Sequence, residues 1–420
     1  MSRIAAGEAS AADFSALQEA FEREAALPGP VSAFEARRTL SDAVAAAVAS
    51  GSDAMLDGIS AVLEPYAADE KSEHRELARD LLGQKIRCAA AAKGDTARLD
   101  HLAQRLDEDV PESRTDGTAG DREGLHPRAD LFRVAARGER VAAAGYLGAV
   151  LVSDDGGKTW SAPATGTDEP LFDVALGPGD EIWAVGRSGV VIRSRDGGKT
   201  FERRATPFRR HLFGVLAPSA GSALVAGDFG LQLRTDDGGA RWTCLPRDAD
   251  LIVSAVRSAG PDAVFAGEFG TIERLHGLAL PGRRGVLVGV PEDVEIHDVW
   301  FREDGRVGVA VGVAGTLVRS EDGGETWTAV SGLPAGVDLY GVGGSGDVVV
   351  VAGDGGYVAT SRDGAKSFVE AQAPPVPAPL LGVAFAGPER GYVVGPRGLV
   401  LRTDDGGAHF TPVHGAGARR

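Results

Sequence analysis

The octapeptide SDDGGKTW, Ser153 to Trp160, is the stretch of this 420-residue sequence that decides the fold. Variants of it return five times, as SRDGGKTF from Ser194, TDDGGARW from Thr235, SEDGGETW from Ser320, SRDGAKSF from Ser361 and TDDGGAHF from Thr403. Six copies of an acidic, glycine-rich turn are either six binding sites or one structural element used six times. The surrounding sequence decides between these two interpretations.

A second motif, Gly-x-x-Gly, recurs with the same period. Its first glycines are Gly145, Gly186, Gly227, Gly267, Gly312, Gly353 and Gly395, at successive spacings of 41, 41, 40, 45, 41 and 42 residues. The chain therefore contains seven units, one more than the number of octapeptides. Repeats of this length indicate a solenoid, a propeller or an array.

Each unit contains the signals of four strands. In the second unit LFDVAL (171–176), IWAVG (182–186) and VVIRS (190–194) are apolar and separated by turns, and the polar TFERRATP follows the octapeptide. Four strands in about 41 residues, repeated seven times, predict an all-β, seven-bladed β-propeller. The first strand of each unit is the most apolar, so we expect these strands to line the central channel.

The sequence before residue 128 has a different character. Apolar residues at helical spacing predict four or five short amphipathic helices within 1–110, the first preceded by a possible capping box at Ser10 to Asp13. The charged faces of these helices are solvated surface or, less simply, a docking surface. Residues 111–127 are polar and rich in helix breakers, which indicates a flexible linker. The propeller then occupies 128–414, and 415–420 form a disordered tail.

Composition excludes several classes of protein. A net charge of −16 argues against a general nucleic-acid binder, and no apolar run is long enough to cross a membrane. The first 30 residues lack a signal peptide, and two cysteines, Cys88 and Cys244, favour a reducing compartment, so we expect a cytoplasmic protein. We expect no cofactor and no metal: the histidines are scattered, and GVGGSG (341–346) precedes a strand rather than a helix.

The octapeptide is explained by the needs of a tight turn. Its third residue can accept hydrogen bonds from the turn's own backbone, its glycines allow positive φ, and its last residue can bury an aromatic ring. We therefore interpret it as structural; one carboxylate per turn falls short of a calcium site. The residues concerned are Asp155, Trp160, Asp196, Phe201, Asp237, Trp242, Asp322, Trp327, Asp363, Phe368, Asp405 and Phe410.

These residues resemble the Asp-box, or bacterial neuraminidase repeat. Its combination with the Gly-x-x-Gly step is similar to the photosystem II assembly and stability factor family and its non-photosynthetic bacterial relatives, over residues 128–414. The resemblance implies the fold, whereas Asp-box propellers include glycosidases, receptors and assembly factors. The sequence departs from that family in lacking an export signal and in having a helical domain. In unit four GTIERLHG runs into LALPGRRGVLVGVPEDVE instead of an octapeptide, through decay or through an insertion that makes contacts.

No catalytic residues are assigned. The opening Arg-Ile-Pro element of sialidases is missing, and seven units disagree with the six of that family. A glycosidase that uses two carboxylates from distant loops stays open as an alternative.

The loops that differ between units are the better candidates for a site. We expect the loops after the second and fourth strands to bind a partner through Tyr146, Arg187, Arg209, Arg210, His211, Asp228, Phe229, Glu268, Phe269, Asp354 and Arg397. Phe229, Phe269 and Tyr146 form a contact patch, unless the two Phe rings turn inward and plug the channel mouth. One basic cluster is expected either to meet an acidic partner or to form a solvated strand edge. Its residues are Arg203, Arg204, Arg209 and Arg210.

The expected function is therefore a non-catalytic interaction scaffold or assembly factor. Its partner is another protein or protein complex, not nucleic acid or membrane. One alternative is a protein that neutralises a cognate effector or toxin. The other is a glycan-binding protein or a glycoside hydrolase of the Asp-box type.

Overall fold

The computed structural model describes residues 2–25, 30–69, 72, 75–106, 129–245, 251–278, 283–288, 294–334 and 336–415. These residues divide into two compact units, a helical one and one made of strands, with 207–209 and 241–243 assigned to the first. The linker expected at 111–127 and residues 416–420 of the expected tail lie outside the described residues. The two units are considered separately.

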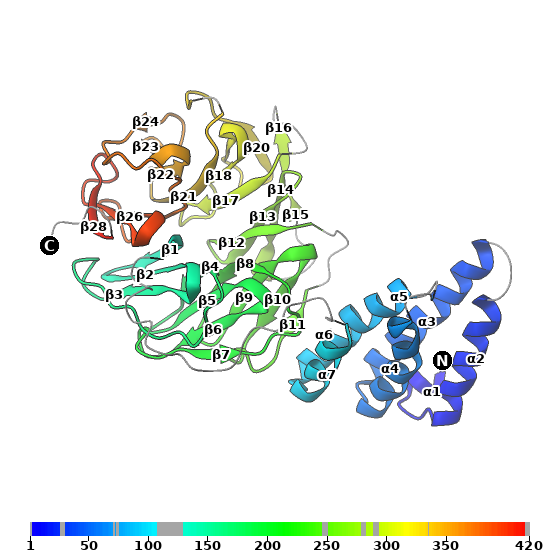
Figure 1. Ribbon diagram of the computed structural model, residues 1–420. Helices are drawn as coiled ribbons and strands as arrows, with labels where there is room; N and C mark the ends of the chain where they lie inside the picture. Colours follow the sequence, from blue (N-terminus) through cyan, green and yellow to red (C-terminus); the bar gives the residue numbers. More distant parts are fainter. Residues whose placement is uncertain are drawn as a thin grey trace. The chain divides into compact units, whose positions relative to one another are not determined.

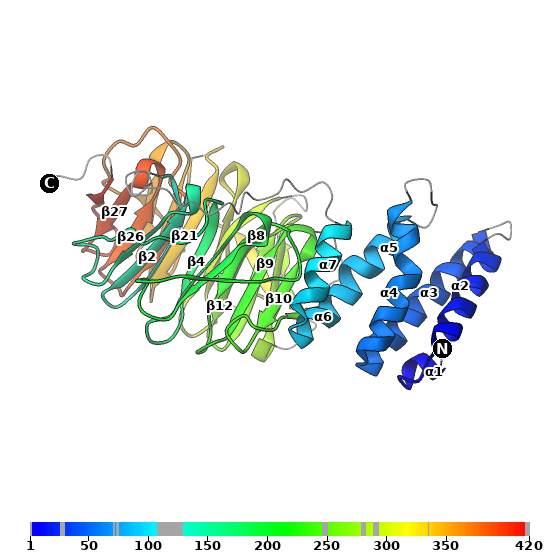
Figure 2. The same ribbon diagram turned by 60° about the horizontal axis from the view of Figure 1, so that its bottom comes forward.

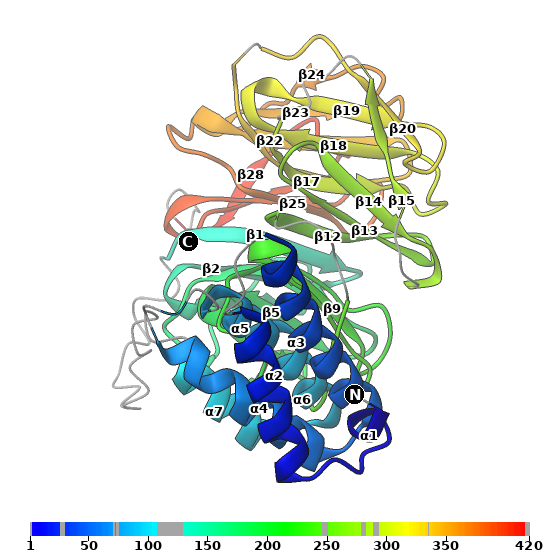
Figure 3. The ribbon, with the colours of Figure 1, turned by 90° about the vertical axis from the view of Figure 1, so that its right-hand side faces the viewer.

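The helical unit contains more helices than the four or five expected. Its elements are α1 (Ser2–Ala5), α2 (Ala11–Ala25), α3 (Pro30–Ser50), α4 (Asp53–Ala68), α5 (Arg75–Asp80), the π-helix η1 (Leu81–Ile86), α6 (Arg87–Lys93) and α7 (Thr96–Leu106). Helices α2, α3 and α4 lie side by side and share one apolar core (Figure 3). The N-terminus of α2 is held as the capping box predicts, since Ser10 donates its main-chain N–H to Asp13 at 2.7 Å.

Helical periodicity predicts most of the core correctly. Phe14, Phe21, Leu40 and Val44 are buried, and Gly58 leaves the space that the Phe14 ring occupies, 2.2 Å from where a Cβ would lie. Val48, expected on the same face, is exposed because it lies near the end of α3, beyond the part of that helix that the core covers. The side chains of Leu77 and Leu106 lie outside the described set.

The second unit is a seven-bladed β-propeller, as the sequence predicts (Figures 1 and 2). Blade 1 has β1 (Leu131–Arg137), β2 (Arg140–Gly145) and β3 (Val150–Ser153). Blade 2 has β4 (Leu171–Leu176), β5 (Ile182–Gly186), β6 (Val191–Ser194) and β7 (Glu202–Arg204). Blade 3 has β8 (Leu212–Leu216), β9 (Ala223–Gly227), β10 (Gln232–Thr235) and β11 (Thr243–Cys244). Blade 4 has β12 (Val253–Ala259), β13 (Asp262–Gly267), β14 (Thr271–Leu275) and β15 (Arg283–Arg284).

The remaining blades complete the ring. Blade 5 has β16 (Val286–Val288), β17 (Ile296–Phe301), β18 (Gly308–Gly312), β19 (Leu317–Ser320) and β20 (Thr326–Ala329). Blade 6 has β21 (Leu339–Ser345), β22 (Val348–Gly353), β23 (Val358–Ser361) and β24 (Val369–Glu370). Blade 7 has β25 (Gly382–Phe385), β26 (Gly391–Val394), β27 (Val400–Thr403) and β28 (Thr411–His414). The first long strand of every blade lines the central channel, as expected from its apolar sequence.

Two blades depart from the expected four strands. In blade 1 the outer strand is reduced to a single bridge between Val152 and Ser161, since Pro163 cannot donate to a ladder. In blade 4 the chain leaves β15 and forms β16, which pairs in parallel with β20 of blade 5. The segment without an octapeptide therefore makes contacts with the next blade.

The octapeptide folds around its carboxylate. Ser153 donates its hydroxyl to Asp155 Oδ1 at 2.8 Å, and Thr159 donates its N–H at 2.9 Å and its hydroxyl at 2.6 Å to the same carboxylate. The bonds from Thr159, from Ser153 and from the turn's backbone hold the pKa of Asp155 below its ordinary value. Gly156 and Gly157 adopt positive φ. The aromatic residue that ends the octapeptide is buried in the case of Trp327 and half-buried in the case of Trp160.

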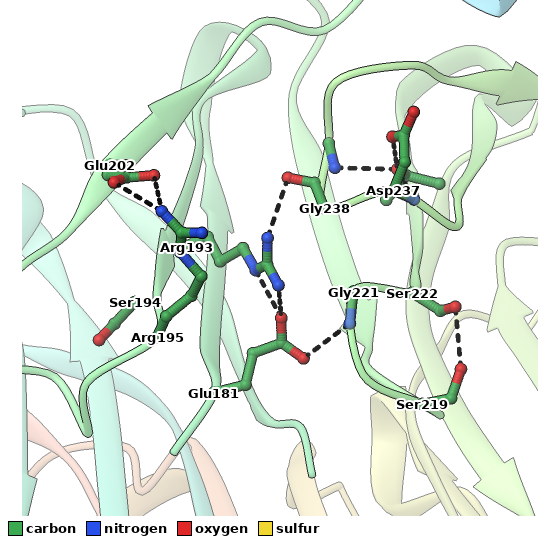
Figure 4. A network of polar contacts seen from close by, with 12 residues as sticks. Glu181, Arg193, Ser194, Arg195, Glu202, Ser219, Gly221, Ser222, Asp237 and Gly238 are labelled. Carbon is green, nitrogen blue, oxygen red and sulfur yellow. Dashed lines mark hydrogen bonds and ion pairs between the residues drawn. The ribbon is translucent and has the colours of Figure 1, made fainter. Parts of the chain in front are cut away.

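The same turns also join neighbouring blades. In four of them the carbonyl of the first glycine accepts a hydrogen bond from an arginine on the third strand of the preceding blade: Arg193 to Gly238, Arg274 to Gly323, Arg319 to Gly364 and Arg402 to Gly156. Figure 4 shows the joint between blades 2 and 3, where Arg193 also pairs with Glu181 and Glu181 accepts the Gly221 N–H at 3.2 Å. Each turn is therefore both a hairpin and an acceptor for the blade before it.

The ring closes without exchanging a strand, because blade 1 comes from 131–153 and blade 7 from 382–414. Arg402 donates to the Gly156 carbonyl at 3.0 Å, and Arg390 pairs with Glu139 at 2.6 Å. The Leu131 N–H donates to the Gly395 carbonyl at 3.0 Å. Side-chain and main-chain hydrogen bonds, together with the apolar cluster between the two blades, hold the joint.

Two observations bear on the cellular setting. No helix within the described ranges is long and apolar enough to cross a membrane. Neither Cys88 nor Cys244 is a free thiol, which differs from the reduced cysteines that the sequence favours. A cytoplasmic location stays a prediction.

We expect Arg402→Ala to lower the free energy of unfolding of the propeller by about 1.5–3 kcal/mol, the range for a hydrogen bond with a charged donor. Arg402 is largely buried, and its loss leaves the Gly156 carbonyl without this donor at the closing joint. Urea unfolding followed by tryptophan fluorescence measures the effect, since all five Trp residues lie in the strand-containing part of the sequence. The control is Arg195→Ala, which removes an exposed ion pair and should change stability by less than about 0.5 kcal/mol.

We expect the propeller to lose stability as the pH falls from about 4 towards 2. Although partial burial raises it, the hydrogen bonds from Thr326 and Ser320 lower the pKa of Asp322 to about 2, against about 3.9 in an unfolded chain. A depressed pKa in the folded state contributes stability above the unfolded pKa, which is lost as protons bind at lower pH. The urea midpoint measured from pH 6 to pH 2 should fall less steeply in Asp322→Asn than in the wild type, and equal slopes would contradict this account.

Candidate functional site

One face of the propeller carries the tight turn that follows the second strand of every blade; we call it the top face. These turns are η3 (Tyr146–Gly148), η4 (Arg187–Gly189), η5 (Asp228–Gly230), residues 268–270, η7 (Val313–Gly315), η8 (Asp354–Gly356) and η9 (Pro396–Gly398). The glycine before each turn is required: at Gly145 a Cβ would lie 2.0 Å from the Asp130 carbonyl. The expected variable loops are therefore held on a uniform backbone.

The middle residue of each turn adopts a left-handed conformation. Six of the seven are not glycine, with φ between 51° and 55°: Leu147, Ser188, Phe229, Phe269, Ala314 and Arg397. This conformation costs roughly 1–2 kcal/mol for a residue with a Cβ. Strain that recurs at the same position in six blades is a feature of functional sites and of constrained loops.

Three aromatic rings on these turns project into solvent. Tyr146 is 51% exposed, Phe229 is 58% exposed and Phe269 is 54% exposed. The alternative in which both Phe rings plug the channel mouth is therefore wrong, since neither ring lines the pocket at the mouth. The Arg210 guanidinium lies over the Phe229 ring, 4.9 Å from its centroid.

The carboxylates of the top face hold its backbone. Asp228 accepts the His211 N–H at 3.2 Å, and Glu268 accepts the Ile252 N–H at 2.9 Å. Asp130 and Asp338, which the sequence did not single out, do the same for the left-handed turns of blades 7 and 5. Two of the expected partner-binding carboxylates are therefore used to position loops.

The cations expected at the site are more accessible. Arg187, Arg209 and Arg397 are exposed, whereas Arg210, His211 and Asp354 are half-buried. His211 accepts the Ser188 N–H on Nδ1 at 3.1 Å, so it supports the turn of blade 2. Asp354 adds to burial in raising the pKa of Tyr340 to about 12. Burial and charge pairing thus divide the candidates into supporting residues and exposed ones.

A pocket that the sequence did not predict opens at the top of the channel. In blades 1 to 6 the register of the strand that lines the channel is irregular after its first residue. The second residue of each of these strands, together with the equivalent residue of blade 7, forms the channel mouth. The residues at this position are Phe132, Phe172, Phe213, Ser254, His297, Tyr340 and Leu381. They line a cavity of about 320 Å³ that is mostly apolar.

The mouth has an aromatic side and a polar side. The Phe172 ring lies 5.9 Å from Phe132 and 5.3 Å from Phe213, centroid to centroid. On the other side His297 and Tyr340 stack at 5.1 Å. A pocket of this kind suits a large apolar side chain that carries a polar group.

Two arginines cross the channel below the mouth. Arg133 of blade 1 donates to the carbonyls of His297, Tyr340 and Leu381, which belong to blades 5, 6 and 7. Its position, the third in the strand LFRVAA, is glycine or alanine in four of the other units. A charged residue in an otherwise apolar strand could have marked Arg133 as unusual. The sequence does not show that its side chain contacts blades 5, 6 and 7.

Arg257 of blade 4 binds two buried carboxylates, Asp173 of blade 2 at 2.7 Å and Asp298 of blade 5 at 3.0 Å. Burial alone would lower the pKa of Arg257, but the two carboxylates outweigh it and raise the pKa. Each aspartate also accepts the main-chain N–H of the next blade, Val215 or Val342. The channel is therefore a structural core with a pocket at its top.

The described ranges contain no candidate metal site. No group of three or more His, Cys, Asp or Glu side chains there is arranged to hold a metal ion. What the arrangement offers is an apolar pocket, exposed rings and exposed arginines on one face.

Comparison with known proteins supports the fold class. The model of the BNR/Asp-box repeat matches residues 151–162. The solved structure of YCF48 from Cyanidioschyzon merolae is 21% identical, covers 66% of this chain and 96% of its own, and has a TM-score of 0.54. YCF48 bound to D1 peptide gives 19% identity, 66% and 92% coverage, and the same TM-score. No curated protein matches the chain.

The likeness extends beyond Asp-box propellers. The WD40 repeats of RRP9 are 11% identical, with 66% and 94% coverage and a TM-score of 0.53. The propeller thus carries Asp-box repeats and resembles YCF48, as the sequence indicates. At these identities the structural likeness establishes the fold.

We expect Arg257→Met to lower the free energy of unfolding by about 3–5 kcal/mol, because it leaves two buried carboxylates without their shared cation. The triple variant that also carries Asp173→Asn and Asp298→Asn should be more stable than Arg257→Met alone. Equilibrium unfolding in urea measures both. A triple variant less stable than the single one would show that the carboxylates matter through their main-chain bonds rather than through Arg257.

Proposed function

We propose that this chain is a non-catalytic scaffold that binds another protein on the top face of its propeller. The observation that carries the proposal is the combination of an apolar channel mouth with three solvent-exposed rings on rigid left-handed turns. Large exposed rings that are held in place bury apolar area at little entropic cost, which is typical of binding hot spots. One similar structure, YCF48 bound to D1 peptide, is of a propeller of this fold in complex with a peptide.

The charge of the top face is consistent with a protein partner. Asp228 and Glu268 accept backbone N–H groups, whereas Arg397 is exposed and Arg187, also exposed, lies 3.9 Å from Glu169. A partner would meet apolar rings rimmed by guanidinium groups, which are enriched at protein interfaces.

A hydrolytic role is less well supported. Glycoside hydrolysis requires a pair of carboxyl groups of which one is protonated. The two buried carboxylates of the channel, Asp173 and Asp298, share the Arg257 cation and accept main-chain N–H groups. These contacts give both carboxylates a structural role.

The test compares partners captured from native cells by the wild type and by a variant with Tyr146→Ser, Phe229→Asn and Phe269→Asn. Asn is chosen because it tolerates the left-handed conformation. Since the three rings are exposed, we expect the fold to be unchanged and the specific partner to be lost by at least tenfold in quantitative mass spectrometry. Circular dichroism and urea unfolding verify the fold.

The matched control is Val286→Ser with Val288→Ser, which removes two exposed apolar side chains from outer strand β16 rather than from the top-face turns. This variant should retain the partner. Equal capture by all three proteins, or cleavage of a glycan panel by the wild type, would contradict the proposal.

A further inference from the structure

The outer edge of blade 5 is occupied by a strand from the preceding repeat. Strand β16 pairs in parallel with β20, and the Val286 N–H donates to the Glu325 carbonyl at 2.9 Å. The pair is set by the octapeptide, since Glu325 is its sixth residue and Trp327 its eighth. The octapeptide therefore presents a carbonyl and an N–H to an incoming extended chain.

The same pairing occurs once more, on blade 7. The Gln372 N–H donates to the carbonyl of Ala408, the sixth residue of that octapeptide, at 2.9 Å. The N–H of Phe410, the eighth residue, donates back to the Gln372 carbonyl at 2.8 Å. Two blades thus use one geometry to bind an extended segment, and we call this carbonyl and N–H pair the edge slot.

On blade 6 the edge slot has no hydrogen-bonded segment among the described residues, although Leu333 packs against the same apolar cluster as Phe368. Its sixth and eighth residues are Lys366 and Phe368, and the Phe368 N–H has no hydrogen-bond partner within the part of the chain that the structure describes. Ser331, which corresponds in sequence to Val286 and Gln372, forms no such pair there. The next residue, Val369, is 73% exposed, which leaves an apolar side chain beside an unused main-chain donor.

The open slots of blades 1 and 2 are less suited to a partner. They also have lysine at the sixth residue, Lys158 and Lys199. In blade 2, however, the residue after the octapeptide is Glu202, which pairs with Arg195 and Arg204. In blade 1 it is Ser161, a polar residue whose hydroxyl donates to the Val152 carbonyl, so this edge has no exposed apolar side chain like that of Val369. Blade 6 is therefore the best candidate.

Charge complementarity in the filled slot indicates which chain would fit the open one. On blade 5 Arg283, three residues before Val286, pairs with Glu325, the sixth residue of the octapeptide, at 3.2 Å. On blade 6 the sixth residue has the opposite charge, so the complementary side chain three residues before the pairing residue is acidic. Lysine on a strand edge also hinders unwanted pairing, so it selects against a chain without that charge.

We propose that the edge slot of blade 6 binds an extended segment of a partner protein by parallel β-addition, with an acidic side chain against Lys366. The segment would donate a main-chain N–H to the Lys366 carbonyl and accept the Phe368 N–H. Main-chain bonds supply affinity and the charge supplies specificity, as in other cases of strand addition. This surface is distinct from the channel mouth and does not depend on the function proposed for it.

The test uses two capped peptides based on residues 283–288 of this chain, RRGVLV and its charge-reversed form EEGVLV. With the full-length wild type at low ionic strength, we expect EEGVLV to bind at least threefold more tightly in fluorescence anisotropy. We also expect it to slow hydrogen exchange of the Phe368 amide at least tenfold at saturation. In Lys366→Glu the preference at this amide should reverse. An EEGVLV peptide N-methylated on its first valine lacks the pairing N–H and should not protect the Phe368 amide.

The other outcomes contradict the proposal. Equal protection of the Phe368 amide by both peptides in the wild type would exclude charge selection. If Lys366→Ala strengthens the binding of both peptides, the lysine serves only to block pairing. Absence of protection at Phe368, with protection at blade 1 or 2 instead, would assign the slot to another blade.

Discussion

The hydrogen bond from an arginine to the carbonyl of the next blade's octapeptide turn is the constraint on which this ring depends. Sheets in a propeller pack through apolar faces, which resist separation but tolerate sliding. A charged donor aimed at one carbonyl fixes the distance between two neighbouring blades. Arg402 makes this contact where the first and last blades meet. With a main-chain hydrogen bond and an apolar cluster, it closes the ring without a shared strand.

The binding surface follows from this rigidity. A left-handed residue with a Cβ is tolerated only where its neighbours hold it, and here Asp130, Asp228, Glu268 and Asp338 fix the loops through backbone N–H groups. The exposed rings of Phe229 and Phe269 therefore have a defined direction. Of the residues predicted to contact a partner, some hold the loops in place and others are exposed on them.

The repeat period predicted the number of blades and the position of the turns, because strand length and turn chemistry are local properties. The channel mouth could not be predicted in this way. Phe132, Phe172 and Phe213 look like ordinary core residues until an irregular strand register turns them towards the channel. The contacts of Arg133 with other blades depend on the diameter of the closed ring. The pairing of β16 depends on the edge strand of the next blade, which the local sequence does not indicate.

Most sequence repeats of this propeller coincide with one sheet each, which affects how the number of blades can change by duplication or loss. Because the strands of six of the seven sheets each come from a single repeat, a duplication or loss of one repeat would add or remove a whole sheet without leaving an unpaired strand. Two repeats depart from this pattern: β16 of the fourth repeat joins the sheet of blade 5, and Gln372 of the sixth repeat pairs with the edge of blade 7. Loss of either repeat alone would therefore also remove the segment that covers the edge of the next blade.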